Sequence, residues 1–366
     1  MNIETIRTTK MAMRFFRFGN ENGKPFVIIP GAALKSVMLS AELIAAQYSA
    51  LAGDFNVHVF DRREDIPEVY SIYDMADDTA EAMDSLGLTG SVVYGVSQGG
   101  MIAQAMAVRR PELVERLILC STAPYIPEAS AKIVGEWARC AENRDVPGLM
   151  KAFAENVYSE AYLDKYRDAF AAFGKSLTED DLARFVLSTR SIGSFDIREH
   201  LGKIKCPLLV IAADNDRIFG TEPSAEIAER TGGELVVCRG QSHAVYDEDP
   251  SVIVRTAEFA LGKRAVFVPE DICFLNDLNE KRYETNILTL HLRSDGSAVI
   301  EDEVSSPGSS AGNTFGGKFY RELPCCFWRE LTALQIAGMY PSLTEAIIRD
   351  GRLAGLIERL KSGGQQ

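Results

Sequence analysis

The 366-residue sequence lacks the features of disulfide-rich, zinc-binding and membrane-spanning proteins. Its seven cysteines are odd in number and irregularly spaced, and no C-x-x-C pair occurs, which argues against a disulfide framework and against a zinc site. No uninterrupted apolar stretch is long enough to cross a bilayer. Residues 1–10 are polar and contain no apolar core of a secretion signal. We therefore expect a soluble protein of the reducing cytoplasm.

Positive charge is also in short supply. Lys and Arg number 39 against 52 Asp and Glu, a formal net charge of −13, and no basic run could form a phosphate-binding patch. The sequence contains neither a Walker A motif nor G-x-G-x-x-G, and none of its four histidines has a partner at metal-ligand spacing. We therefore expect no nucleic-acid or membrane partner, no cofactor and no metal.

Short apolar segments alternate with helical patterns along the first part of the chain and again near residue 210. Such segments predict buried strands. They are residues 26–29, 57–60, 91–94, 117–120, 208–211 and 235–238. Helical patterns at 41–51 and 74–86 separate the first three segments. The alternation predicts an α/β fold with right-handed crossovers and a mostly parallel central sheet flanked by helices.

The strand pattern disappears between about residues 127 and 201. Four helical patterns replace it, at 130–141, 146–158, 161–173 and 178–188. In the second pattern Leu149, Met150, Phe153 and Val157 form one apolar stripe, which either packs in a core or lines a substrate pocket. In both cases a helical insert splits the α/β unit.

The tail changes character again after about residue 263. Residues 285–293 place leucines on one face at period two, and 298–304 returns after a turn, which predicts a β-hairpin. Three helices are predicted further on, at 328–339, from Ser342, and at 353–361. We expect a small α+β appendage over 265–366. Its role stays open between a homo-oligomer surface, an extra lid and a docking module.

A strand, the motif Gly95-Val96-Ser97-Gln98-Gly99 and a helix rich in small residues follow one another directly. A serine on such a sharp turn has its hydroxyl exposed at the top of the sheet. Gly95 and Gly99 are needed because a Cβ there would collide with the neighbouring strand or helix. The helix N-terminus behind the serine adds free N–H donors. We predict that Ser97 is a nucleophile, and the alternative is a glycine-rich turn with an incidental serine.

A serine hydroxyl needs a base, and that base needs an orienting carboxylate. Among the four histidines, His58 lies within a strand pattern, His200 in the helical insert and His291 in the tail. His243 lies on a loop just after the last predicted core strand. This position favours His243 as the base over a solvated surface histidine.

The orienting acid is expected between the serine and the histidine in the chain. The strand at 208–211 leads into Asp214 and Asp216. We prefer Asp216, which lies further out along the loop. Asp214 is the alternative, and its position favours a turn-forming role in which it bonds nearby backbone.

Attack on a carbonyl creates an oxyanion that N–H donors must stabilise. The backbone N–H of Gln98 is one candidate, because it follows the serine at the start of the helix. The second is expected from the loop after the strand at 26–29, where Pro30-Gly31-Ala32-Ala33 has no bulky side chain. Ala32 is the preferred second donor, and Ala33 is the one-residue alternative.

These segments resemble the α/β-hydrolase superfamily over about residues 15–264. The resemblance lies in Pro30-Gly31, the turn around Ser97, the strand ending at Asp216, and the Gln241-Ser242-His243 loop. The sequence is most similar to the cap-bearing esterases, lactonases and haloperoxidase-like enzymes, because residues 99–103 and 110–114 match phrases typical of that group. 

The resemblance implies a particular domain organisation. The hydrolase core comprises residues 1–124 and 206–264, and the helical insert, 125–205, is a cap over Ser97. Two loops depart from the family pattern, since Pro30-Gly31 replaces the common His-Gly and residues 61–64 lack the usual glycines. Residues 265–366 match no family that we recognise.

The sequence thus predicts a serine hydrolase that cleaves a small or medium carboxylic ester, thioester or lactone through an acyl-enzyme. Its substrate partner is a small acyl compound. Three alternatives stay open: an acyltransferase, a C–C bond hydrolase on the same triad, and a non-catalytic ligand receptor or scaffold. The identity of the substrate and its acyl size depend on how the cap packs.

Overall fold

The computed structural model describes residues 1–238, 240–249, 251–262, 286–292, 298–304 and 318–323. The chain divides into two compact units, Met1–Asp249 and Pro250–Gln366, and each is described by itself. The first unit contains an eight-stranded sheet in the order β1-β2-β4-β3-β5-β6-β7-β8. Its strands are β1 Ile3–Arg7, β2 Ala12–Gly19, β3 Lys24–Ile29, β4 Phe55–Arg63, β5 Ser91–Val96, β6 Val114–Cys120, β7 Leu208–Ala213 and β8 Glu234–Cys238.

The sheet is parallel from β4 through β3 to β8, as predicted. All six predicted strand segments lie within these strands. The sequence analysis missed β1 and β2, which add to β4 in antiparallel pairing. Arg14 and Arg17 interrupt the apolar pattern of β2 and hide the alternation of buried Met13 and Phe15.

The helices predicted between residues 41 and 188 are confirmed within a few residues at each end. Outside the cap, the first unit contains α1 Ala41–Gln47, α2 Ile72–Ser85, α3 Gln98–Arg109, α8 Glu222–Thr231 and α9 Val245–Glu248, of which α8 and α9 were not predicted. The helix α2 begins at a capping box in which Ser71 and Asp74 exchange hydrogen bonds. None of the described helices has the length and hydropathy that a membrane crossing requires.

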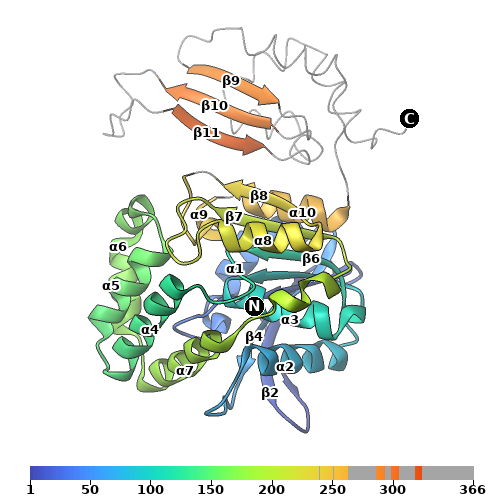
Figure 1. Ribbon diagram of the computed structural model, residues 1–366, viewed down its shortest axis with the longest axis vertical. Helices are drawn as coiled ribbons and strands as arrows, with labels where there is room; N and C mark the ends of the chain where they lie inside the picture. Colours follow the sequence, from blue (N-terminus) through green and yellow to red (C-terminus); the bar gives the residue numbers. More distant parts are fainter. Residues whose placement is uncertain (239, 250, 263–285, 293–297, 305–317, 324–366) are drawn as a thin grey trace. The chain divides into compact units, whose positions relative to one another are not determined.

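Four further helices lie between β6 and β7 and form the cap. They are α4 Glu128–Glu142, α5 Val146–Val157, α6 Glu160–Lys175 and α7 Glu179–Arg190. Figure 1 shows them gathered in green at one end of the sheet. The turn between α4 and α5 is closed by Asp145, whose side chain accepts from the N–H of Gly148 at 3.0 Å. The α/β fold with a helical cap insertion is therefore confirmed.

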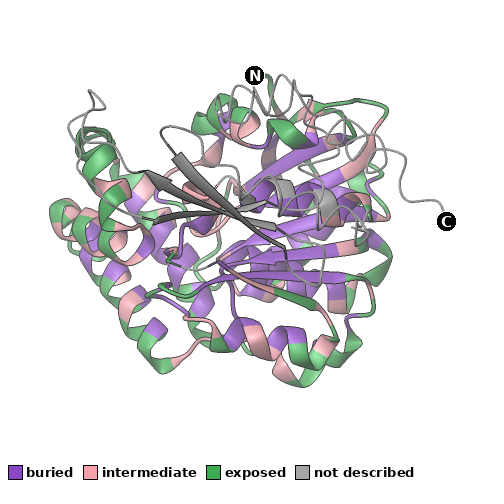
Figure 2. Ribbon diagram, turned by 90° about the horizontal axis from the view of Figure 1, so that it is seen from above, coloured by how far each residue is buried: buried purple, intermediate pink, exposed green. Residues whose placement is uncertain are grey.

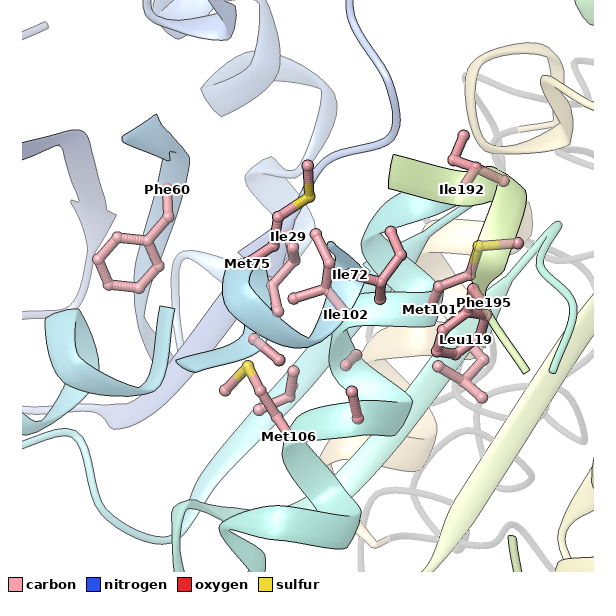
Figure 3. Close-up of a cluster of buried hydrophobic side chains, with 14 of the residues drawn as sticks. Ile29, Phe60, Ile72, Met75, Met101, Ile102, Met106, Leu119, Ile192 and Phe195 are labelled. Atoms are coloured by element: carbon pink, nitrogen blue, oxygen red, sulfur yellow. The ribbon is translucent and has the colours of Figure 1, made fainter. Parts of the chain in front are cut away.

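The central strands are buried on both faces, as Figure 2 shows in purple. Alternate residues contribute to different faces. Val27, Ile29 and Val93 join one large apolar cluster with α2 and α3. Figure 3 shows part of this cluster, in which Met101 and Ile102 of α3 lie close to α2 and the segment after α7. This packing holds α3, and with it the turn that precedes α3.

The second unit contains α10 Ser251–Leu261 and a three-stranded antiparallel sheet. Its strands are β9 Asn286–Leu292, β10 Ala298–Val304 and β11 Lys318–Leu323. The predicted hairpin is confirmed, because β9 pairs with β10 in a register that sets Leu292 opposite Ala298. The third strand, β11, was not predicted. The helices expected at 328–339, from Ser342, and at 353–361 lie outside the described residues.

Candidate active site

Ser97 lies on the turn between β5 and α3, where the backbone is constrained by close packing. Its φ of 52° and ψ of −119° are unusual for a residue with a side chain. A Cβ built on Gly99 would lie 1.9 Å from the carbonyl oxygen of Ile29, and one on Gly95 would lie 2.5 Å from that of Gly99. The expected need for both glycines is therefore confirmed. Strand β3 leaves no room for a Cβ at Gly99, and the start of helix α3 leaves none at Gly95.

The hydroxyl of Ser97 is within hydrogen-bond distance of His243. The distance from Ser97 Oγ to His243 Nε2 is 3.0 Å, and the distance from His243 Nδ1 to Asp216 Oδ2 is 2.8 Å. The His243 side chain is only 3% exposed, and the Asp216 side chain is buried as well. The structure therefore brings together the three residues that the sequence analysis selected, across 146 residues of chain.

The Asp216 carboxylate is held from its other side. Its Oδ1 accepts hydrogen bonds from the backbone N–H groups of Ile218 at 2.8 Å and Phe219 at 3.0 Å. These bonds leave Oδ2 directed at the imidazole. The side chain of Asp214 contacts backbone instead, because its Oδ1 accepts a hydrogen bond from the N–H of Gly240 at 2.6 Å. Of the two aspartates, Asp216 is the one that contacts His243.

The cap fixes the loop that carries the histidine. The carbonyl oxygen of Val157, at the end of α5, accepts the hydroxyl of Ser242 at 3.0 Å and the N–H of Ala244 at 2.8 Å. These two donors flank His243 in the chain. Glu248 Oε1 lies 2.8 Å from the same Ser242 hydroxyl and shares its single proton with the Val157 carbonyl. The cap is therefore part of what orients the imidazole, a role that the sequence alone did not indicate.

Two backbone segments border the hydroxyl of Ser97. Gln98 is the first residue of α3, and the N–H groups of a first helical turn have no acceptor within their helix. The loop after β3 passes on the other side, because a Cβ built on Gly31 would meet the Cβ of Ser97 at 3.2 Å. In this loop Ala32 is half-buried and Ala33 is exposed. Both residues line the same cavity, so Ala32 stays the preferred second donor and Ala33 the alternative.

The side chain of Gln98 joins the core to the cap. Its Nε2 donates to the carbonyl of Ser188 at 2.7 Å and to the hydroxyl of Ser191 at 3.1 Å, while its Oε1 accepts the hydroxyl of Ser188 at 3.1 Å. Arg62 donates to the same Oε1. The sequence analysis missed Arg62, although its place at the carboxyl end of strand β4 was a signal for the site edge.

A cavity of about 550 Å³ lies beside this site, between the core and the cap. Gly31 and Val96, which flank Ser97, belong to its wall, and Asp247 lies on the wall as well. Much of the remainder is apolar and aromatic, including Met150 and Phe153 of the α5 stripe. Burial raises the pKa of Asp247, and hydrogen bonds from Gln47 and Tyr158 partly oppose this effect.

A second, larger cavity of about 930 Å³ lies between α5 and α6. It shares the wall residues Met150, Tyr158 and Phe170 with the first cavity but includes neither the loop after β3 nor Val96. The cavity that borders Ser97 is therefore the candidate substrate site.

The other histidines lie elsewhere. His58 is buried in β4, His200 is exposed after the cap, and His291 falls in β9, where side chains are not described. Within the described ranges no three His, Cys, Asp or Glu side chains are grouped so that they could hold a metal ion.

The mostly parallel sheet, the cap between β6 and β7 and the serine on the β5–α3 turn define an α/β-hydrolase architecture. The model of the alpha/beta hydrolase family matches residues 26–256, more than half of the chain, and the chain belongs to this family. The match confirms the resemblance noted in the sequence.

Known relatives include hydrolases of two named kinds. "Putative carbamate hydrolase RutD" of Rhizobium rhizogenes is 27% identical over 231 residues, which cover 59% of this chain and 88% of that protein. The 3-oxoadipate enol-lactonase 2 of Acinetobacter baylyi is 20% identical over 261 residues, which cover 70% of this chain and 95% of that protein.

Solved structures share the fold at low identity. An alpha/beta hydrolase, MGS-M2, from a Medee basin deep-sea metagenome library has a TM-score of 0.65 at 18% identity, covering 73% of this chain and 100% of that one. The enol-lactonase of Burkholderia xenovorans has a TM-score of 0.62 at 22% identity, covering 71% of this chain and 100% of that one. These likenesses show the fold and leave the reaction to be argued from the site.

Proposed function

We propose that this hydrolase cleaves a small or medium carboxylic ester, thioester or lactone through an acyl-enzyme on Ser97. One observation carries the proposal: a continuous hydrogen-bonded path runs from Ser97 Oγ through both nitrogens of His243 to Asp216. A path with these donor and acceptor roles is what activation of a serine hydroxyl requires. The named carbamate hydrolase and enol-lactonase among the relatives fit a reaction at an acyl carbon.

In the first half-reaction Ser97 Oγ attacks the acyl carbon while His243 Nε2 accepts the hydroxyl proton. Asp216 accepts the Nδ1 proton, holds this tautomer and stabilises the imidazolium that forms. The N–H groups of Gln98 and Ala32 donate to the oxyanion of the tetrahedral intermediate. The intermediate collapses when the alcohol or thiol departs with the proton from Nε2.

In the second half-reaction a water molecule attacks the acyl-enzyme. His243 Nε2 accepts a proton from this water, and the same N–H donors hold the second oxyanion. Collapse releases the acid and returns the proton to Ser97 Oγ. If an alcohol or amine takes the place of water, the same steps perform acyl transfer, so product analysis in the presence of an added alcohol separates the two reactions.

A panel of p-nitrophenyl esters of increasing acyl length, run on the full chain, tests the proposal. We expect turnover of the short and medium esters, covalent labelling by a fluorophosphonate, and loss of both in Ser97→Ala. Ser85→Ala, which removes a hydroxyl on the exposed end of α2, is the matched control and should retain both. A folded protein that neither turns over any ester nor takes the label would overturn the proposal and favour a ligand receptor.

A further inference from the structure

Asp247 is a carboxylate on the wall of the candidate substrate cavity, and the catalytic steps above do not use it. It lies on the short helix α9, four residues after His243, and is half-buried. The same cavity reaches Gly31 and Val96 beside Ser97. A substrate that fills the cavity from the nucleophile would therefore pass close to this carboxylate.

The Asp247 carboxylate is held in place and has acceptor capacity to spare. Gln47 Nε2 donates to its Oδ1 at 2.9 Å, and the Tyr158 hydroxyl donates to its Oδ2 at 3.3 Å. Gln47 also donates to the carbonyl of Tyr246 at 2.7 Å, which fixes the backbone of α9. An ionised carboxylate has about four acceptor sites, so two remain for a ligand.

The carboxylate has no cationic partner within the described part of the chain. No Lys, Arg or His nitrogen there lies within 4.0 Å of it. Lys35 is the one described cation on the cavity wall, and it donates to the carbonyl of Ser176 at 2.7 Å and pairs with Asp181 at 3.5 Å. The neighbouring carboxylate of Glu248 adds negative charge instead of balancing it.

Three tyrosines lie near the Asp247 carboxylate. Tyr48, Tyr158 and Tyr246 line the same cavity. Burial is the main cause that raises the pKa of each hydroxyl, and the charge of Asp247 is the next cause, so all three lie within its field. The face of a tyrosine ring attracts a cation, and the attraction is larger where water is excluded.

We propose that Asp247 and these tyrosines form a subsite for a positively charged nitrogen, so that the substrate is an ester bearing a protonated or quaternary amine. A cation is the ligand that satisfies an uncompensated carboxylate and aromatic faces together. The net charge of −13 also favours the approach of cationic substrates. The reaction in this inference rests on the proposed function, but the binding does not.

The test compares two esters of the same shape and different charge: butyrylcholine and its neutral carbon isostere, 3,3-dimethylbutyl butyrate. Affinities are measured by calorimetry on the full chain carrying Ser97→Ala, which prevents turnover. We expect the cationic ester to bind at least about tenfold more tightly than the isostere. Asp247→Asn, which keeps the shape and removes the charge, should bring the ratio close to one.

Asp164→Asn is the matched control, because it removes one carboxylate from the wall of the other cavity. It should leave the ratio unchanged. Three results would each overturn the inference. The first is equal affinity for the two esters in the Ser97→Ala protein with Asp247 intact, and the second is no binding of the cationic ester. The third is an undiminished ratio of the two affinities in a folded Asp247→Asn variant. The first two readouts need no substitution at position 247, so they hold even if that variant misfolds.

Failure of the proposed function has a different signature. In that case the protein with an intact Ser97 turns over neither ester and takes no fluorophosphonate label, while the binding ratio persists.

Discussion

Arg62 and Gln98 are joined by a hydrogen bond of 3.0 Å between Arg62 Nη2 and Gln98 Oε1, although 36 residues separate them. The same nitrogen donates to the carbonyl oxygen of Pro30 at 2.7 Å. Arg62 therefore holds both backbone segments that border Ser97, the loop after β3 and the start of α3. We infer that it positions the two candidate oxyanion donors.

Replacement of Arg62 by Met should lower kcat by about one to two orders of magnitude, because a hydrogen bond from a charged donor contributes about 1.5–3 kcal/mol. KM should change less, since the cavity wall stays in place. Arg62→Lys keeps a donor and should recover part of kcat. Arg63→Met is the control, because Arg63 donates instead to Asp78 and to the carbonyl of Lys10. Equal losses in both variants would contradict a positioning role.

Asp214 and Asp216, the two aspartates after β7, offer a matched test of which carboxylate orients His243. Asp216→Asn should lower kcat on p-nitrophenyl esters by about three to four orders of magnitude, because an amide cannot hold the required imidazole tautomer. Asp214→Asn removes charge from a residue that contacts Gly240 and should leave kcat within a few-fold. Steady-state kinetics decide the matter, and a larger loss at Asp214 would reverse the assignment.

Gly99→Ala should abolish the native fold or destabilise it severely, since its Cβ would meet the Ile29 carbonyl oxygen at 1.9 Å. Gly135→Ala is the control inside helix α4, where nothing lies within 4 Å of an added Cβ. That change should stabilise the protein by about 0.5–1 kcal/mol, because alanine favours the helix over glycine. Thermal melts and soluble yield of the two variants provide the measurement.

Asp247 predicts a pH dependence of stability whose sign follows from its raised pKa. The folded state holds the Asp247 proton more tightly than the unfolded state, where the pKa is near 3.8. The stability that this preference contributes is complete below that value and is lost as the pH rises through the folded-state pKa. The Asp247→Asn variant has no carboxylate at this position, so it does not lose this stability as the pH rises.

The melting temperature of Asp247→Asn relative to the native protein should therefore increase by a few degrees from pH 4 to pH 8. Differential scanning calorimetry at both pH values measures the difference. If the difference in melting temperature between the two proteins stays constant or decreases as the pH rises, the buried Asp247 carboxylate does not destabilise the folded state.

Local patterns in the chain were enough to predict the parallel strands, the cap helices and the three residues Ser97, Asp216 and His243, but not Arg62 or Asp247. Ser97 follows from a glycine motif between a strand and a helix, and His243 from its place after the last core strand. The α5 stripe shows the limit of such patterns. Leu149 and Val157 are buried in the core, while Met150 and Phe153 line the candidate substrate cavity, so the stripe is divided between the core and the cavity wall.

By itself the sequence determined the parallel strands, most of the helices and where the glycine turn lies, because these depend on residues close together in the chain. Tertiary structure decided what surrounds the serine. The bond from Gln47 to Asp247 spans 200 residues, that from Tyr158 spans 89, and Val157 of the cap reaches Ser242 across 85. No local pattern encodes such contacts, since they arise only when segments distant in the chain pack together and exclude water between them.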